Sequence, residues 1–229
     1  MSQRTVAIIQ ARMGSTRLPG KVMMKLGSRS ILGYVARRLE SAASVDEIVV
    51  ATTTHFRDEI IVHEAEALGL NCYQGSESDV LRRYLDAATV FKADVVVRVT
   101  ADNPFSDPLS IDRVVARVKE GYDYAIENNL PVGTTGEALS FQALEFIDTA
   151  APTDRWREHV TLYAKENPHR LRCSFEDAPR DCARPDLSYT VDSLEEYLQI
   201  KDLCARIPNP NFPLKELIAL ADKPVVINQ

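Results

Sequence analysis

A basic loop that follows an apolar run is the first place where this sequence could do chemistry. Residues 10–21, QARMGSTRLPGK, carry Arg12, Arg17 and Lys21, and the first acidic residue of the chain is Glu40. Arginine binds phosphate oxygens through a planar fork of donors, and lysine adds a compact charge. We therefore expect the loop to bind a polyanion, and a triphosphate is the polyanion that its charge favours.

The loop has neither of the common phosphate-binding patterns, since GxxxxGK[ST] and GxGxxG are both absent from it. Gly14 and Ser15 could instead let backbone N–H groups face the anion. The alternative is a solvated basic loop, but such a loop predicts charges scattered over a surface. The eight lysines and arginines of residues 1–39, with no acid among them, favour an anion site.

Two aspartates follow predicted strands, at places where a metal ion could be held. Asp102 comes two residues after the β-branched run 95–100, and Asp192 ends a later strand pattern. Carboxylates are the side chains that hold Mg²⁺ against a triphosphate. The alternatives are local: Asp102 could form a turn before an Asn-Pro pair, and Asp192 could cap the helix predicted from Ser193.

Alternating strand and helix patterns would position these groups. Apolar runs predict strands at 5–10, 47–52, 71–73 and 95–100. With helical stripes between them, this order predicts an α/β three-layer sandwich, a mainly parallel sheet with helices on both faces. Ligands of such sheets bind beyond the carboxyl ends of the strands, where the basic loop and Asp102 both fall.

The second half of the chain has a looser pattern. We expect a small extension around residues 130–175, with a strand that begins near 137 and another near 171–175. A strand end at 189–192 and a helix from Ser193, where Ser193 and Glu196 can form a capping box, complete the prediction.

The composition fits one folded domain covering residues 1–229. Hydrophobic residues make up 45% of the chain and the net charge is −6. Because the basic charge is focused on one region, a small phosphorylated ligand is favoured over nucleic acid. The four cysteines lack CxxC spacing, so we expect free thiols in the cytoplasm rather than a zinc site. No apolar run is long enough for a signal peptide or a membrane span.

Five blocks of the sequence resemble the cytidylyltransferases that activate acidic sugars, a family that includes the 3-deoxy-manno-octulosonate and acylneuraminate cytidylyltransferases. Within it, the chain most resembles the branch of spore-coat polysaccharide biosynthesis proteins. The blocks are 10–21, 75–84, 98–105, 157–161 and 189–193. They occur in the family's order, which makes the resemblance specific for the family and much less so for the acceptor.

The resemblance implies a Rossmann-like nucleotidyltransferase fold, similar to the GT-A fold, and a Mg²⁺-dependent transfer of CMP from CTP with release of pyrophosphate. The acceptor would be an acidic sugar or a small molecule bearing a phosphate or phosphonate, in surface polysaccharide or related biosynthesis. Asp102 and Asp192 would be the metal ligands, and Arg12, Lys21 and Asp102 the catalytic residues. The resemblance also makes a homodimer possible, with residues 130–175 as an acceptor-binding and dimerisation arm.

Further site residues are assigned by the same resemblance. The nucleotide would contact Ala11, Arg12, Gly14, Ser15, Thr16, Arg17, Lys21, Gly75, Ser76, Asp79, Val80, Arg82 and Thr100. The acceptor would contact Asn103, Glu137, Arg157, Glu158 and His159. One departure is Ala101, where the family often has glycine before the metal-binding aspartate, and this could shift the backbone. The block around Arg157 could also be the start of an amphipathic helix that packs through Trp156.

Two other functions fit parts of the sequence. A glycosyltransferase that uses a nucleotide sugar could be built on a similar sheet, but Ala101-Asp102-Asn103 lacks the second acid of a DxD pair. The basic loop would also have no role in it. A regulatory protein that binds a nucleotide without turnover is the third possibility. We rank the cytidylyltransferase first.

Overall fold

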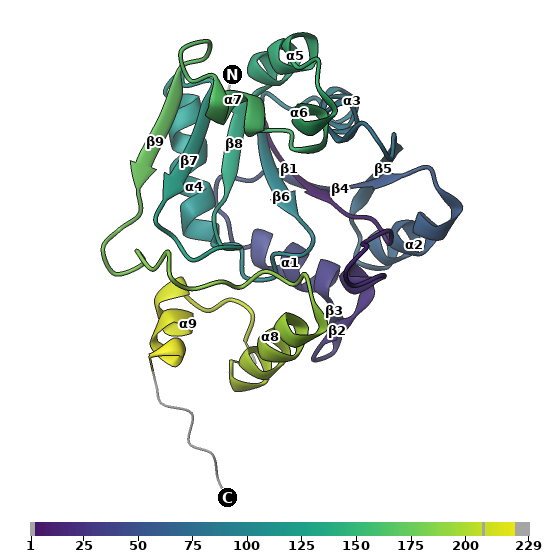
Figure 1. Ribbon diagram of the computed structural model, residues 1–229, viewed down its shortest axis with the longest axis vertical. Coiled ribbons are helices and arrows are strands. Elements are labelled where there is room, and N and C mark those ends of the chain that lie inside the picture. The colour runs from purple at the N-terminus through teal and green to yellow at the C-terminus, as the bar shows by residue number, and fades with distance from the viewer. Residues whose placement is uncertain (1–2, 208, 223–229) are drawn as a thin grey trace, which may run out of the picture.

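A seven-stranded sheet forms the centre of the computed structural model, which describes residues 3–207 and 209–222 (Figure 1). The strand order is β5-β4-β1-β6-β8-β7-β9. The strands are β1 (Thr5–Gln10), β4 (Glu47–Thr53), β5 (Asn71–Gly75), β6 (Val95–Thr100), β7 (Tyr124–Asn128), β8 (Glu137–Ser140) and β9 (Cys173–Asp177). β2 (Lys25–Leu26) and β3 (Arg29–Ser30) form a separate antiparallel pair.

Within this sheet, β8 runs against its two neighbours and the other pairs are parallel. β1 pairs in parallel with β4 and β6, β4 with β5, and β7 with β9. β8 pairs antiparallel to both β6 and β7. Gln10 of β1 lies opposite Ala51 of β4 and Thr100 of β6, so these strands end at one edge of the sheet. The predicted mainly parallel α/β sheet is confirmed.

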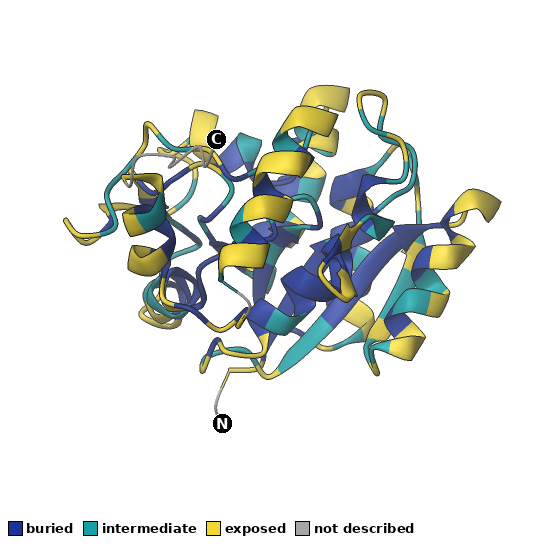
Figure 2. Ribbon diagram, turned by 90° about the horizontal axis from the view of Figure 1, so that it is seen from below, coloured by how far each residue is buried: buried dark blue, intermediate teal, exposed yellow. Residues whose placement is uncertain are grey.

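Helices cover both faces of the sheet, as predicted. They are α1 (Ile31–Leu39), α2 (Glu59–Ala67), α3 (Val80–Val90), α4 (Pro108–Lys119), α5 (Phe141–Ala150), α6 (Asp154–Glu158), α7 (Leu162–Glu166), α8 (Leu194–Arg206) and α9 (Leu214–Ala221), with 3₁₀ turns η1 (Lys21–Met23) and η2 (Phe56–Asp58). Apolar residues of α1, α2 and α4 pack on one face, and those of α3, α5 and α7 on the other. In Figure 2 the buried strands are dark blue, and the helix faces that point to solvent are yellow.

The alternation of side chains along β6 decides which residues reach each layer. Val97 and Val99 belong to the core with α1 and α4, whereas Val96 belongs to the core with α3 and α5. Arg98 and Thr100 continue the second series, because they are two and four residues after Val96. Their side chains therefore lie on the α3 side of the sheet.

A third apolar cluster lies beyond the carboxyl ends of the strands, where α8 and α9 pack around Phe105. These two helices lie at the end of the sheet opposite the N-terminus (Figure 1). The buried Arg38 of α1 donates hydrogen bonds to the backbone oxygens of Ser106 at 2.9 Å, Pro210 at 2.7 Å and Phe212 at 2.9 Å. One buried cation thus connects α1 to the segment between α8 and α9.

Two predicted helix starts are confirmed in detail. Asp107 caps α4 by accepting a hydrogen bond from the Ser110 N–H at 3.0 Å, and Pro108 is the first helical residue. Ser193 and Glu196 form the reciprocal capping box that begins α8. The four cysteines are free thiols, as expected.

The second half of the chain differs from the prediction in its details. Residues 189–192 are not a strand, and the nearest β-contact is an isolated bridge between Val132 and Ser188. The stretch expected as an extension, 130–175, supplies β8 and β9 to the main sheet. In the part of the chain that the structure describes, no helix is both long and apolar enough to cross a bilayer.

Candidate active site

The basic loop after β1 is folded tightly by its own backbone and by a buried acid. The carbonyl of Met13 accepts hydrogen bonds from the N–H groups of Ser15 at 2.9 Å and Gly20 at 3.0 Å. The Met13 N–H in turn donates to the buried carboxylate of Asp58 at 2.7 Å. Gly20 has a φ of 72°, a left-handed conformation that glycine adopts without strain, and it is followed at once by Lys21 in η1. The loop therefore closes on itself and returns Lys21 toward the sheet.

Lys21 lies between the two predicted metal ligands. Its Nζ is 2.6 Å from Oδ2 of Asp102 and 2.8 Å from Oδ1 of Asp192, and the lysine side chain is only 9% exposed. Arg17 contacts the other oxygen of Asp192 at 2.8 Å. Burial disfavours the Asp192 carboxylate, but Lys21 and Arg17 more than offset this, so the pKa of Asp192 lies below its usual value. The structure thus brings together groups that are far apart in the sequence.

Asp192 reaches this place through backbone contacts made by the residues before it. The N–H of Val191 donates to the carbonyl of Asp102 at 2.9 Å, and the N–H of Tyr189 donates to the carbonyl of Val132 at 2.8 Å. Gly133 permits the close approach: its φ is 85°, and a Cβ there would be 3.0 Å from the backbone N of Thr190. The 130–134 loop therefore holds the segment that carries Asp192.

A cavity of about 510 Å³ opens beside these groups, at the carboxyl ends of β1 and β6. Five cationic side chains and three carboxylates line it, which suits an anionic ligand (the cations are Arg12, Arg17, Lys21, Arg83 and Arg98, and the acids Asp102, Glu158 and Asp192). The predicted site residues that share the wall are Ala11, Arg12, Ser15, Thr16, Arg17, Lys21, Val80, Thr100, Asp102, Asn103, Glu158, His159 and Asp192. Those outside this wall are Gly14, Gly75, Ser76, Asp79, Arg82, Glu137 and Arg157.

Arg157 is used within the protein, where it clamps α6 to the start of α3. Its Nε donates to Asp79 at 2.7 Å and its Nη2 to Asp148 at 2.6 Å. Arg82 contacts Asp86 at 2.8 Å and Asp148 at 3.5 Å. Arg157 and Asp79 line a neighbouring cavity of about 460 Å³, which shares Arg12, Val80 and Glu158 with the first. Arg157 is therefore paired with Asp79 and Asp148, and it lies next to the main cavity rather than in its wall.

Gly14 and Gly75 are each close to an arginine side chain. A Cβ at Gly14 would lie 2.6 Å from Nη2 of Arg57, and a Cβ at Gly75 would lie 3.0 Å from Cγ of Arg83. Arg83 is 1% exposed and donates from Nη1 to the carbonyl of Ser76. Gly75 and Ser76 therefore pack against a cation that lines the cavity, although they do not line it themselves.

Glu137 is buried on β8, directly opposite Arg98 of β6. Oε1 of Glu137 accepts a hydrogen bond from Lys165 at 2.6 Å, and Oε2 is 3.8 Å from Nη1 of Arg98. Burial disfavours the carboxylate, but Arg98 and Lys165 outweigh this and hold the pKa of Glu137 below its usual value. Glu137 thus supports the cavity from behind through Arg98.

Several residues of the cavity wall were missed by the sequence reasoning. They are Gln10, Val22, Arg83, Arg98, Ala101 and Thr190. Two of them carry a signal that could have been used. Arg98 interrupts a β-branched apolar strand, and Arg83 falls beside the apolar stripe of a helix. A cation at such a position has to be neutralised or has to face a polar ligand.

Asp102 and Asp192 fit a divalent metal by their chemistry, because two carboxylates already share one cation between them. Across residues 3–207 and 209–222, no group of three or more acidic, histidine or cysteine side chains forms a metal cage. Mg²⁺ commonly binds through one or two carboxylates and completes its shell with water and substrate phosphates. The pair could therefore hold Mg²⁺ whose remaining ligands come from water and a bound anion.

Comparisons with known proteins find similarity to cytidylyltransferases. A family profile described as Cytidylyltransferase matches residues 6–229. Spore coat polysaccharide biosynthesis protein SpsF of Bacillus subtilis is 37% identical over 223 residues, 94% of this chain and 93% of that protein. The 3-deoxy-manno-octulosonate cytidylyltransferase of Geobacter metallireducens is 28% identical over 174 residues, 68% of this chain and 66% of that protein. The solved structure of a cytidylyltransferase from Leptospira borgpetersenii has a TM-score of 0.90 at 28% identity, and the match covers 96% of this chain and 94% of that one.

Proposed function

Because this chain belongs to the cytidylyltransferase family, we propose that it transfers CMP from CTP to an acidic sugar or to a small molecule bearing a phosphate or phosphonate, with Mg²⁺. The observation that carries the proposal is the position of Lys21. It joins a loop rich in cations to two carboxylates that can hold a metal. A triphosphate with its metal requires these two kinds of group side by side.

In the proposed reaction, an oxygen of the acceptor attacks the α-phosphorus of CTP. The bond that breaks joins this phosphorus to the oxygen bridging the α- and β-phosphates. Pyrophosphate then leaves with that oxygen. Arg12, Arg17 and Lys21 bind the β- and γ-phosphates and stabilise the charge that the leaving group gains. Asp102 and Asp192 would hold Mg²⁺, which supplies charge neutralisation at the α-phosphate when it is bound.

The two other functions considered from the sequence receive less support. In a glycosyltransferase the loop cations would have no triphosphate to bind, and Pro104 stands where a DxD pair that begins at Asp102 needs its second acid. The assay below distinguishes an enzyme from a regulatory protein that binds the nucleotide without turnover.

The test is pyrophosphate release from CTP and Mg²⁺ with a panel of sugar acids, sugar phosphates and phosphonates. We expect release with at least one acceptor class, and Asp102→Asn should lower kcat/KM about a thousandfold because a metal ligand is lost. Asp202→Asn, at an exposed position on α8, is the matched control and should keep full activity. Full activity of Asp102→Asn would contradict the metal assignment, and CTP binding without turnover on any acceptor would favour the regulatory protein.

A further inference from the structure

Arg98 is a cation that faces the main cavity without a hydrogen-bond partner. It lies within β6, and its side chain is only 18% exposed. Among the described residues, its guanidinium makes no hydrogen bond, and its Nε is fully enclosed without a partner. The nearest acid is Glu137, whose Oε2 is 3.8 Å from Nη1 of Arg98, too far for a hydrogen bond. A charged donor group in this state is costly, and such groups in native proteins need an explanation.

The acid behind Arg98 does not satisfy its donors: Glu137 uses Oε1 for Lys165, and its Oε2 is buried without a hydrogen-bond partner in the described part of the chain. Lys165 donates to Glu137 at 2.6 Å, so one carboxylate faces two cations. Lys165 is an exposed residue, so the buried part of this cluster of three is the pair of Arg98 and Glu137, whose side chains are not hydrogen-bonded to each other. Of these three side chains, Arg98 alone lines the cavity. An anion in the cavity would complete the hydrogen bonds of Arg98.

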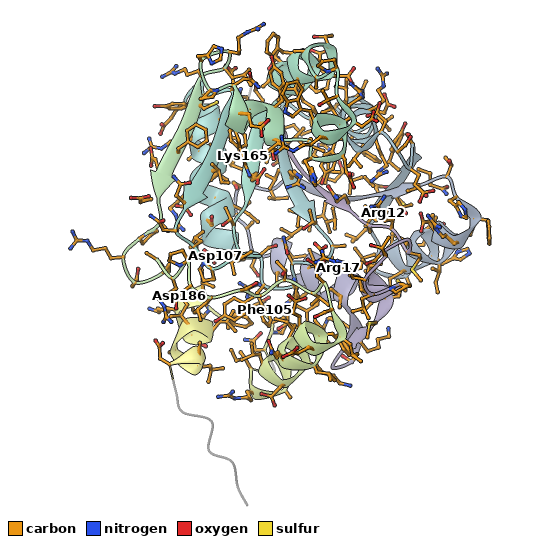
Figure 3. The ribbon with its side chains drawn as sticks, in the orientation of Figure 1. Arg12, Arg17, Phe105, Asp107, Lys165 and Asp186 are labelled. Atoms are coloured by element: carbon orange, nitrogen blue, oxygen red, sulfur yellow. The ribbon has the colours of Figure 1, made fainter. Side chains whose placement is uncertain are left out.

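The position of Arg98 separates it from the cations of the basic loop. Arg17 and Lys21 are both in contact with Asp192. Arg98 instead belongs to β6 and is supported by Glu137 and Lys165, from the second half of the chain. In Figure 3, Lys165 lies on the β8 side of β6, whereas Arg12 and Arg17 lie on the other side, toward β1. Arg98 thus lines a part of the cavity apart from the loop cations, to which the proposed function assigns the phosphates that leave.

We propose that Arg98 binds the anionic group of the acceptor, a carboxylate or a phosphate, and so selects acidic acceptors over neutral ones. This inference rests on the proposed function, and it assigns to one side chain a selectivity that the loop does not provide. Arginine suits the task because its fork of donors matches the two oxygens of a carboxylate or phosphate. Glu137 and Lys165 act as positioning residues that hold the guanidinium in place.

The main test compares the wild-type protein with Arg98→Met, which keeps the length and apolar body of the side chain and removes the charge. Acceptors are tested in two arms, sugar acids and sugar phosphates, each with a neutral analogue such as the methyl ester of the acid. In the arm that the wild type uses, Arg98→Met should raise the acceptor KM about ten- to hundredfold, as expected when a charge-assisted hydrogen bond is lost. The KM for CTP should change less than about twofold, and the preference for the acidic acceptor over its neutral analogue should disappear.

Two further variants separate selectivity from damage to the fold. Arg98→Lys keeps the charge and should recover part of the acceptor affinity. Arg117→Met removes a cation from an ion-paired surface position on α4 and should leave both KM values unchanged. A raised KM for CTP with an unchanged acceptor KM would overturn the assignment, and so would an acceptor preference that survives in Arg98→Met.

Calorimetric titration of CTP with Mg²⁺ into the wild type separates this proposal from the proposed function. Absence of CTP binding would refute the function itself. Two outcomes would overturn the role of Arg98 while leaving the family chemistry intact. In the first, the protein binds CTP and uses a neutral acceptor with saturation. In the second, it binds CTP and uses neither sugar acids nor sugar phosphates.

Discussion

At the scale of residues, the position of Lys21 decides how the charges of the cavity balance. Its ammonium contacts both Asp102 and Asp192, at the place where a divalent ion would bind, and together with Arg17 it balances their two negative charges. A triphosphate on the basic loop would attract the same ammonium and free the carboxylates. We therefore expect metal and nucleotide to bind together, with the metal alone binding weakly because it has to displace a lysine.

Replacing Lys21 by methionine should strengthen the binding of Mn²⁺ to the nucleotide-free protein about tenfold or more, because the competing charge is removed. The same change should weaken the binding of CTP, since a phosphate ligand is lost. Mn²⁺ binding can be followed by electron paramagnetic resonance and CTP binding by calorimetry. Lys25→Met, at an exposed residue of β2, is the control and should change neither. Equal Mn²⁺ affinity in Lys21→Met and the wild type would contradict this account.

At the scale of elements, the short contact between two loops positions Asp192, the proposed second metal ligand. The 130–134 loop passes so close to residues 189–190 that only a residue without a side chain fits at Gly133. Gly27 offers a matched comparison, because its φ of 62° is also left-handed while nothing lies within 4 Å of its Cβ position. The two glycines share the conformational requirement and differ in the space around them.

Gly133→Ala should therefore lower both stability and activity, whereas Gly27→Ala should affect stability alone. We expect Gly27→Ala to cost about 1 kcal/mol from its backbone conformation. Gly133→Ala should cost more, and kcat should fall because Asp192 moves away from Asp102. Urea unfolding and the rate of pyrophosphate release measure the two effects. If Gly133→Ala kept a normal kcat, the loop would not be what positions Asp192.

The elements of the first half could be predicted because their sequence patterns are local. β1 and β6 were predicted with the bounds that the structure has, since a parallel strand buried on both faces is a continuous apolar run. β7, which begins at Tyr124, was not predicted. Residues 189–192 were wrongly predicted as a strand. The N–H groups of Tyr189 and Val191 donate to two separate loops, at Val132 and Asp102, rather than to one neighbouring strand. Arg98 was missed as a site residue because its pairing with Glu137 depends on β8, which joins β6 across a long connection.

At the scale of the whole molecule, the third apolar cluster attaches the C-terminal helices to the end of the sheet that carries the site. Arg38 makes three hydrogen bonds to backbone oxygens there, and its guanidinium lies 4.3 Å from the centre of the Phe212 ring. α8 begins directly after Asp192. The attachment of α8 and α9 is therefore expected to hold Asp192, the proposed second metal ligand, in place.

Arg38→Met should destabilise the protein by about 3 kcal/mol or more, because buried carbonyls lose a charged donor. Hydrogen exchange should rise in α8 and α9 before it rises in β1 and β6, since the sheet keeps its own core. Arg37→Met, at the neighbouring surface residue that pairs with Glu40, is the control and should stay within about 0.5 kcal/mol of the wild type. Uniform exchange across the molecule would show that Arg38 supports the sheet as well.

The contact between Lys21 and Asp192, which are far apart in the sequence, also has a consequence for the synthesis of the protein. The ribosome releases the cationic loop early, while Asp192 and the helix that follows it are still to be made. During that time Arg17 lacks the carboxylate that it contacts in the folded protein, and Lys21 has only Asp102 of its two. Once Asp192 has been synthesised, it can contact Arg17 and Lys21. The site is therefore completed, and these two charges are paired, late in translation.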